Sequence, residues 1–401
     1  MDIKFSKEDE EFRKEVSTWL DENIPDFWKG IRLQPFGEIP EEDDVVEFLK
    51  EWQATLFDAG WAAITWPSEY GGRDANVAQR MILDEEMVKY RAPPSLNMGG
   101  ISQLGPVLIA AGTKAQKERF LRPMLRGEEL WCQGFSEPGA GSDLASLRTA
   151  AGDKGGHFLV NGQKVWTSMP ARYADWCYAL VRTDKDAPKH KGISYLLIDM
   201  KSPGITVRPL KNITGSVEFS EVFFDDVKVS KENIVGELNQ GWKVANMNLE
   251  HERLSLGLAF NLYNKRWLDD LIVMTRKMKR KGRPVVENPR IRQKIAQSYI
   301  EVEIGRLNGI RSLSRMLKEG RPGPEASMSR LWSSMVNQRM MELAMEIQGP
   351  YSQMDRGSPQ SIEDGFWQYA YVRSKAHTIA AGTSEIQKNI IAERILGLPR
   401  G

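Results

Sequence analysis

The sequence predicts an α+β protein of three parts: an N-terminal helical domain over residues 1–130, a central antiparallel β domain over 131–232, and a C-terminal four-helix bundle over 233–401. Three observations lead to this prediction. Apolar residues first recur at helical spacing, β-type runs then replace them, and the helical period returns after Gly236. The 401 residues exceed one usual domain, and the apolar fraction of 41% is ample for a continuous core.

Two amphipathic segments predict the helices of the first domain. F-R-K-E-V-S-T-W-L, residues 12–20, and V-V-E-F-L-K-E-W-Q-A-T-L-F, residues 45–57, place apolar residues three and four apart. Proline and glycine turns separate these runs. A lobe of several packed helices is therefore expected.

The central domain is predicted from short β-type runs. H-F-L-V-N-G-Q-K-V-W-T-S, residues 157–168, is interpreted as two strands joined by a turn at Asn161-Gly162, the strongest short hairpin signal. More strand-like runs follow: W-C-Y-A-L-V-R, I-S-Y-L-L-I-D-M, I-T-V-R-P-L and V-E-F-S-E-V-F-F. Together they predict a small β lobe of sandwich or barrel type, with mostly antiparallel pairing.

Long helical runs predict the final bundle. One extends from Asn239 toward Lys281, and others begin after Pro289, after Pro324 and after Thr383. At the start of the last helix, G-T-S-E-I-Q gives Ser384 and Gln387 capping-box spacing. A helix N-terminus presents unpaired N–H groups with a partial positive charge, which suits a phosphate, although most such sequences are only well-capped helices.

Composition excludes several classes of function. The 55 basic and 54 acidic residues nearly cancel, so the chain lacks the positive surface that duplex nucleic acid or an anionic membrane requires. No apolar run approaches the length of a membrane span, and the acidic start M-D-I-K-F-S-K-E-D-E is unlike a signal or transit peptide. A cytoplasmic protein with no nucleic-acid partner is expected.

Cysteine and histidine are too sparse for a metal centre. Cys132 and Cys177 are the only cysteines, and neither has a second cysteine or a histidine at ligand spacing. We expect reduced, structural thiols and no bound metal. The four histidines are scattered and are expected at the surface or as satisfied core residues: His157, His190, His251 and His377.

One acidic residue interrupts an apolar helix face. In the helix that starts near residue 239, Glu252 falls between Leu249 and Leu256 on a stripe that also contains Ala245, Ala259 and Tyr263. Periodicity alone allows two interpretations. Glu252 is either a solvated residue at a wet edge of the stripe or a buried carboxylate that serves as a general base in an apolar cavity.

Two loop and strand motifs could contact a ligand. F-S-E-P-G-A-G-S-D, residues 135–143, places glycines where backbone N–H groups can approach a phosphate or a flat heterocycle, although a glycine pair is more often only a turn. V-W-T-S, residues 165–168, offers an indole beside two hydroxyls. A tryptophan on such a strand usually belongs to the core, but it can also stack on a flat ligand.

These motifs, together with G-W-K-V-A-N-M-N-L-E-H-E-R-L and G-T-S-E-I-Q-K-N-I-I-A-E-R-I-L-G-L-P-R, resemble the acyl-CoA dehydrogenase family in the same order along the whole chain. The resemblance implies an FAD enzyme that oxidises the α–β bond of an acyl-CoA thioester to a trans-2-enoyl-CoA. In that reaction a glutamate removes the α proton, a hydride leaves the β carbon for the flavin, and electrons pass to an electron-transferring flavoprotein. Fatty acid β-oxidation and lipid metabolism are the corresponding processes.

The resemblance also implies site residues. Phe135 and Ser136 are expected along the flavin ring, Trp166 and Ser168 against it from the β domain, and Gly141 and Ser142 near its pyrophosphate. Further residues expected around FAD are Thr383 and Glu385 and, from a neighbouring subunit, Gln293, Glu346 and Gly349. Ser142, Glu250 and Arg253 are expected on the substrate side. A shared site implies a homodimer or homotetramer, with a heteromer as the alternative.

The sequence departs from the commonest pattern of the family at the catalytic base. A glutamate usually precedes G-T-S, whereas this chain has Ala381, which leaves only its backbone N–H to hold the thioester carbonyl. A minority of the family places the base in a bundle-helix sequence like L-x-x-E-R-L, which here gives Glu252. The apolar stripe and the motif therefore select the same residue. This arrangement favours a branched, long or ring-bearing acyl group.

Other departures fall at the expected FAD edge. The usual R-x-x-F-G segment is replaced by R-K-M-K-R-K-G-R-P, and both Glu346 and Glu385 stand where the family has glutamine. Two further functions stay open. An acyl-CoA oxidase would share the same motifs, and a non-catalytic partner subunit that completes an FAD site in a heteromer would explain Ala381 but not Glu252.

Overall fold

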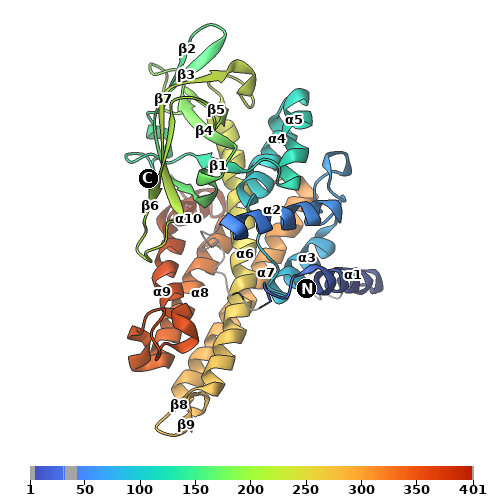
Figure 1. The fold of residues 1–401 in the computed structure, drawn as a ribbon, viewed down its shortest axis with the longest axis vertical. Coiled ribbons are helices and arrows are strands. Elements are labelled where there is room, and N and C mark those ends of the chain that lie inside the picture. Colours follow the sequence, from blue (N-terminus) through green and yellow to red (C-terminus); the bar gives the residue numbers. More distant parts are fainter. Residues whose placement is uncertain (1–4, 30, 32–42, 400–401) are drawn as a thin grey trace. The chain divides into compact units, whose positions relative to one another are not determined.

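The computed structural model describes residues 5–29, 31 and 43–399, which divide into two compact units. Unit 1 contains the described residues within Met1–Gly37, Asn76–Ala92 and Arg253–Gly401, and unit 2 those within Glu38–Ala75 and Pro93–Glu252. The helix α6 (Gly241–Lys277) contributes its first part to unit 2 and its remainder to unit 1 (Figure 1). The predicted class is confirmed, because N-terminal helices, a β sheet and C-terminal helices follow one another along the chain.

Unit 1 is built mainly from helices that pack around a large apolar core, with a smaller apolar cluster at Met81, Ile310 and Leu313. Its helices are α1 (Lys7–Asn23), α3 (Val77–Lys89), the second part of α6, α7 (Pro289–Glu319), α8 (Glu325–Gln348), α9 (Phe366–Ser374) and α10 (Ser384–Arg394), with a small hairpin of β8 (Lys279–Arg280) and β9 (Arg283–Pro284). The helices predicted after Pro289 and Pro324 begin where expected. Large apolar side chains from α6, α8 and α9 form the core, among them Trp267, Leu271, Met340, Ile347 and Trp367.

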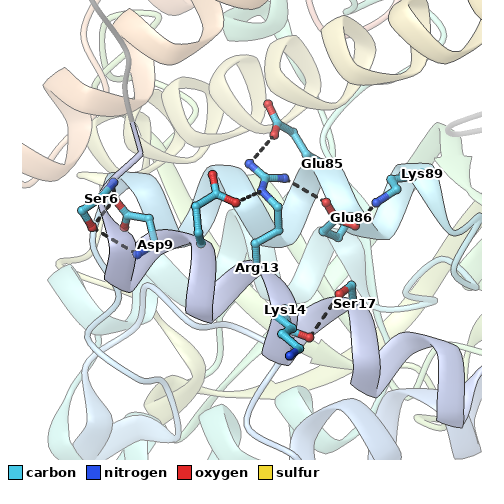
Figure 2. A network of polar contacts seen from close by, with 9 residues as sticks. Ser6, Asp9, Arg13, Lys14, Ser17, Glu85, Glu86 and Lys89 are labelled. Carbon is cyan, nitrogen blue, oxygen red and sulfur yellow. Dashed lines mark hydrogen bonds and ion pairs between the residues drawn. The ribbon is translucent and has the colours of Figure 1, made fainter.

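Ion pairs connect α1 to α3 within unit 1 (Figure 2). Arg13 donates to Glu86 at 2.8 Å and to Glu85 at 3.1 Å, and Lys89 contacts the other Glu86 oxygen at 2.8 Å. Burial opposes the charge of Arg13, but its hydrogen bonds to Glu86 and Glu85 raise its pKa. The carboxylate of Glu86 is buried, so both cations are needed to compensate its lost hydration.

Unit 2 combines helices with a seven-stranded sheet. Its helices are α2 (Asp43–Asp58), a π-helical turn (Gly100–Leu104) that continues into α4 (Gly105–Ala111), α5 (Lys114–Arg126) and the first part of α6. The strands are β1 (Trp131–Gly134), β2 (Ala150–Asp153), β3 (His157–Ser168), β4 (Trp176–Arg182), β5 (Ile193–Asp199), β6 (Ile205–Leu210) and β7 (Phe219–Ser230). Their order is β1-β4-β2-β3-β7-β6, with β5 beside β4 (Figure 1).

The strand pairing is mostly antiparallel, as predicted, with two parallel pairs: β1 with β4, and β2 with β4. The β1–β4 register places Cys132 opposite Cys177. Both thiols are free and buried, in agreement with their prediction as structural residues. Burial and a hydrogen bond between the two thiols raise the pKa of Cys132, the hydrogen bond being the larger cause.

The predicted hairpin turn at Asn161-Gly162 is wrong. β3 runs unbroken through both residues and pairs with β7 along its length, with a bulge between Val160 and Gly162. Gly162 has φ +149°, and a Cβ atom there would lie 2.6 Å from the hydroxyl oxygen of Thr149. Glycine is therefore required by a close approach of two chain segments, because no side chain fits between them.

None of the helices among the described residues is long and apolar enough to cross a membrane. The longest, α6, contains many charged and polar residues along its 37 residues. Its bounds, Gly241–Lys277, lie inside the predicted run from residue 239 toward 281. The predicted domain limits of 1–130, 131–232 and 233–401 stay predictions.

Candidate active site

Glu252 is the central acidic residue of unit 2. Its side chain projects from α6 and is 8% exposed, so the interpretation of a solvated residue at a wet edge is wrong. Gln133, on β1, donates from Nε2 to its Oε2 atom at 3.3 Å. The helical periodicity of α6 therefore places a carboxylate in the interior, where a polar side chain from the sheet meets it.

A stacked pair of tyrosines lies near this carboxylate. The rings of Tyr178 on β4 and Tyr195 on β5 are 6.1 Å apart and nearly parallel. Burial raises the pKa of both hydroxyls, and the negative charge of Glu252 raises it further. Tyr178 donates to Gln103 and Tyr195 donates to Asn248, both at 3.0 Å. The hydroxyls therefore stay neutral donors within a fixed network.

Phe135 joins the loop 135–143 to this network. Its ring is buried and packs edge-on against both Tyr178 and Tyr195, with centroids 5.9 Å away in each case. The neighbouring Ser136 carbonyl accepts from the Val165 N–H at 2.9 Å, which ties the loop to β3. Residues expected from sequence to contact a flavin are thus held beside the residues around Glu252 within unit 2.

A buried ion pair anchors the same loop. Lys164, fully buried on β3, donates to Glu137 at 2.8 Å and to the Phe135 carbonyl at 3.1 Å. Backbone N–H groups of Arg148 and Thr149 donate to the two oxygens of Glu137 at 2.7 and 2.8 Å. Burial alone would raise the pKa of Glu137, but Lys164 and these donors hold it below its usual value. Burial lowers the pKa of Lys164, and Glu137 opposes that change.

The V-W-T-S segment presents alternate side chains to opposite sides of β3. Trp166 is 57% exposed with φ +60°, and its ring contacts Phe219 edge-on at 5.9 Å, whereas Thr167 is buried. Ser168 is exposed like Trp166. Among the described residues, the buried Thr167 hydroxyl oxygen has no hydrogen-bond partner. The exposed indole of Trp166 and the exposed hydroxyl of Ser168 lie on the same side of the strand and fit a flat, hydrogen-bonding ring such as a flavin.

The glycine-rich part of loop 135–143 is open. A Cβ atom added at Gly139 or Gly141 would meet nothing within 4 Å, and Gly141 and Ser142 are exposed. These small, exposed residues let a large anionic ligand approach the loop backbone. The open loop and the exposed side chains of Trp166 and Ser168 in unit 2 therefore fit FAD.

The turn at residues 379–383, in unit 1, has an unusual backbone. Ala381 has φ +54° and Gly382 has φ +86°, two successive left-handed conformations of which only the second suits its residue type. Arg330 on α8 donates to the Ala380 carbonyl, and Gln387 on α10 donates to the Ala381 carbonyl. The turn is therefore fixed by side chains from two helices.

The capping prediction at this turn is wrong in detail. Thr383, not Ser384, is the N-cap of α10, and its hydroxyl accepts from the Ile386 N–H at 3.2 Å. A capping residue is extended, and Thr383 is the last extended residue before Ser384 begins the helix. Gln387 is free to reach back to the Ala381 and Gly382 carbonyls at 2.9 and 3.2 Å.

The remaining predicted residues are dispersed over both units. In unit 1, Gln293 is exposed on α7, Glu385 is exposed in the first turn of α10, and Arg253 is partly exposed. Glu346 pairs with Lys294 and, at 3.5 Å, with Arg290, so its carboxylate is already engaged by two cations. Gly349 ends α8 with φ +59°. Glu250, in unit 2, is partly exposed on α6.

Three family profiles match the chain in order: the acyl-CoA dehydrogenase N-terminal domain over residues 6–128, the middle domain over 132–227 and the C-terminal domain over 239–396. The chain belongs to the acyl-CoA dehydrogenase family. It is accordingly an oxidoreductase, and acyl-CoA dehydrogenases are FAD-dependent flavoproteins.

Individual relatives of this acyl-CoA dehydrogenase are similar over nearly their whole length. The chain is 39% identical to acyl-CoA dehydrogenase IpdE1 of Mycobacterium tuberculosis over 396 residues, which cover 98% of each chain. Among solved structures, the Tcur3481-Tcur3483 steroid ACAD matches with a TM-score of 0.86 and 28% identity, covering 100% of both chains. The ChsE4-ChsE5 complex from Mycobacterium tuberculosis matches with a TM-score of 0.84 and 29% identity, again over 100% of both chains.

Sequence reasoning selected Glu252 as a candidate but did not identify the side chains that contact the predicted site elements within each unit. Gln133, Lys164 and Arg330 are polar residues in otherwise buried segments, and the structure pairs each with an atom of a predicted site element. A polar residue within a segment that is otherwise expected to be buried was the available signal that such a side chain has a partner. The partners lie 119, 27 and 50 residues away in sequence, so no local pattern could identify them.

Proposed function

We propose that the protein oxidises the α–β bond of an acyl-CoA thioester to the trans-2-enoyl-CoA, with FAD as cofactor and Glu252 as the base that takes the α proton. The observation that carries the proposal is the buried Glu252 carboxylate, oriented by a hydrogen bond from Gln133. A general base for a weakly acidic C–H bond needs a fixed position and protection from water. The motif L-E-H-E-R-L selects the same residue by resemblance to the family.

In this proposal, Ala381 binds the carbonyl oxygen of the thioester. Its methyl group cannot accept a proton, but its N–H can donate to the thioester carbonyl oxygen and stabilise the negative charge that develops there as the α proton leaves. Among the described residues, no hydrogen bond engages this N–H. The base and the donor are thus two different residues, Glu252 and Ala381.

The chain supplies a consistent set of residues for FAD. Trp166 and Ser168 would meet its ring, and Phe135, Ser136, Gly141 and Ser142 would line the loop beside it. Thr383 and Glu385 at the start of α10 are further candidates, as are Gln293, Glu346 and Gly349 for a neighbouring subunit. When bound, FAD supplies the acceptor for the hydride that leaves the β carbon.

The proposed substrate carries a ring-bearing acyl group of steroid type. This step rests on the steroid ACAD among the structural neighbours and on the use of Glu252 in place of a base at 381. Alanine at 380 and 381 leaves little side-chain volume on the turn, which suits a bulky substituent. An electron-transferring flavoprotein is the proposed electron acceptor, and the proposed location is cytoplasmic.

Anaerobic flavin bleaching tests the base assignment. The FAD-loaded protein is mixed with CoA thioesters of short, branched, long and steroid-side-chain acids, and flavin absorbance is followed. Glu252→Gln should retain FAD and lose bleaching by more than about 10³-fold, since it removes the proton acceptor. Asp269→Asn is the control, because this exposed carboxylate on the same helix pairs only with the nearby Lys265 in the described contacts. Bleaching of Glu252→Gln at the wild-type rate would refute the assignment.

A second candidate function is that of a partner subunit that completes the FAD site of a heteromer. It is favoured by the two-component names of the neighbours ChsE4-ChsE5 and Tcur3481-Tcur3483. Purification of the chain alone separates the two candidates. A protein that lacks FAD, or that holds FAD and bleaches with none of the thioesters, would support the partner role. Peroxide release in air during turnover would instead indicate an oxidase.

A further inference from the structure

The peptide bond between Ala380 and Ala381 has a fixed orientation. No cis peptide occurs among the described residues, so the carbonyl of Ala380 and the N–H of Ala381 point in opposite directions. Arg330 donates from Nη2 to the Ala380 carbonyl oxygen at 3.0 Å. The Ala381 N–H therefore points away from the guanidinium of Arg330.

Arg330 is itself held rigidly within unit 1. It is 2% exposed, and the same Nη2 atom donates to the His377 carbonyl at 2.7 Å. Its guanidinium carbon lies 5.2 Å from the ring centroid of Phe260 on α6. Burial, the two hydrogen bonds from Nη2 and the contact with Phe260 restrict rotation of the guanidinium, so the orientation of the peptide it binds is restricted as well.

Gln387 fixes the other side of the same residue. It is 1% exposed, and its amide donates to the carbonyls of Ala381 and Gly382. Both peptide planes that meet at Ala381 are thus held by buried side chains. This explains how a non-glycine residue keeps φ +54°, a conformation that is unfavourable for residues with a Cβ atom unless it is supported.

The unengaged donor of this turn is the Ala381 N–H. The N–H groups of Ile379 and Ala380 both donate to the Ala376 carbonyl, whereas the N–H of Ala381 makes no hydrogen bond to any described residue. A hydrogen bond to the carbonyl of a peptide polarises its N–H. Arg330 therefore both aims this N–H and strengthens it as a donor.

We propose that Arg330 and Gln387 are positioning residues that present the Ala381 N–H to the thioester carbonyl oxygen of the acyl-CoA. The inference rests on the proposed function, in which the Ala381 N–H binds the thioester carbonyl oxygen, and it names the residues that orient this N–H. Arg330 orients the peptide before Ala381, and Gln387 orients the peptide after it. Neither side chain contacts the substrate in this role.

The test measures the thioester carbonyl directly. The probe is the 3-thia analogue of the acyl-CoA that bleaches wild-type protein fastest, with ¹³C at the thioester carbonyl. Its α proton can be lost, but sulfur replaces the β carbon, so no hydride can leave. Isotope-edited infrared difference spectra report hydrogen bonding to the carbonyl, and long-wavelength flavin absorbance reports loss of the α proton.

Arg330→Met should move the carbonyl band of the probe toward its position in free solution. It should also slow flavin reduction by the parent acyl-CoA by about 10- to 100-fold, with probe affinity and FAD content changed much less. Arg330→Lys should recover part of both effects, since it keeps a cationic donor. Gln387→Leu should change the carbonyl band and the rate of flavin reduction in the same direction. It replaces Arg330→Met in the test if that variant does not fold. Gln338→Leu is the matched control, because Gln338 donates to Ser374 and Thr378 on the adjoining turn without touching Ala381.

The outcomes separate the inference from the proposed function. If wild-type protein bleaches but the carbonyl band of Arg330→Met or Gln387→Leu equals that of wild type, the positioning role is refuted and the proposed function stands. If Gln338→Leu shifts the carbonyl band as much as Arg330→Met does, the positioning role is also refuted, because the shift would then come from general disorder of the turn. If no acyl-CoA bleaches the wild-type protein, the proposed function fails and the inference falls with it.

Discussion

Replacing Lys164 by methionine should destabilise unit 2 severely. Lys164 is fully buried, and its removal leaves the Glu137 carboxylate, itself 8% exposed, with two backbone donors and no cation. Breaking one side of a buried ion pair typically costs about 3–5 kcal/mol. The lost hydrogen bond to the Phe135 carbonyl adds to this cost. We therefore expect a loss of about 4 kcal/mol.

This loss converts into a measurable change in melting temperature. An unfolding entropy of about 2.1 cal/mol/K per residue gives a decrease of about 5 °C if the whole chain unfolds together, and about 10 °C if unit 2 unfolds alone. Differential scanning calorimetry of the FAD-loaded protein measures it. In the wild type, stability that Glu137 contributes above pH ~4.5 is lost as pH falls through its lowered pKa, which Lys164 helps to hold below the usual value. Without Lys164, burial raises that pKa and protonation neutralises the unpaired carboxylate, so the variant should lose less stability on acidification than the wild type.

A double variant supplies the control. In Lys164→Met with Glu137→Gln, no charge is left buried, so much of the loss should return, with a coupling energy of about 2 kcal/mol or more. A melting temperature for Lys164→Met within about 1 °C of wild type would contradict the buried ion pair. Strict additivity of the two single changes would contradict their direct interaction.

Three further predictions concern other parts of the chain. Burial lowers the pKa of His251 to about 4, so stability should fall as pH drops from 6.5 toward 4, by up to about 3 kcal/mol, and His251→Gln should flatten this dependence in pH-resolved melting curves. Gly162→Ala should cost more than about 2 kcal/mol in urea titrations, whereas Gly156→Ala, with open space around its Cβ, should cost less than about 1. Arg13→Leu should lower the melting temperature more than Lys89→Leu, because the Lys89 side chain is 65% exposed; equal effects would contradict this ranking.

Much of the fold was predictable because helix and strand periods persist over long segments. The helices after Pro289 and Pro324 begin where the sequence predicts, since proline at a helix start is a local signal. The turn at Asn161-Gly162 was not predictable. An Asn-Gly pair favours a hairpin locally, but glycine also suits a bulge, and the close approach of Thr149 to Gly162 requires the glycine here.

Candidate site residues could be predicted where they lie on a regular helix face. They could not be predicted where they depend on contacts between segments distant in sequence. Glu252 could be selected because its stripe on α6 is regular, and its burial excludes the interpretation of a solvated residue at a wet edge. Its role as a general base stays a proposal. The support from Gln133 and Arg330 depends on segments distant in sequence. The cap of α10 was misassigned by one residue because threonine and serine both cap helices and only the backbone dihedral angles show which of the two precedes the helix.

The register of β1 and β4 allows separation of these two strands to be detected with the protein's own cysteines. Its only two cysteines, Cys132 and Cys177, are opposite each other on these strands and are inaccessible to solvent in the folded sheet. A thiol reagent can therefore react only when the strands separate, so the labelling rate measures local opening or global unfolding without any engineered probe. Mass spectrometry of partly labelled protein would show whether both thiols become reactive in a single cooperative event.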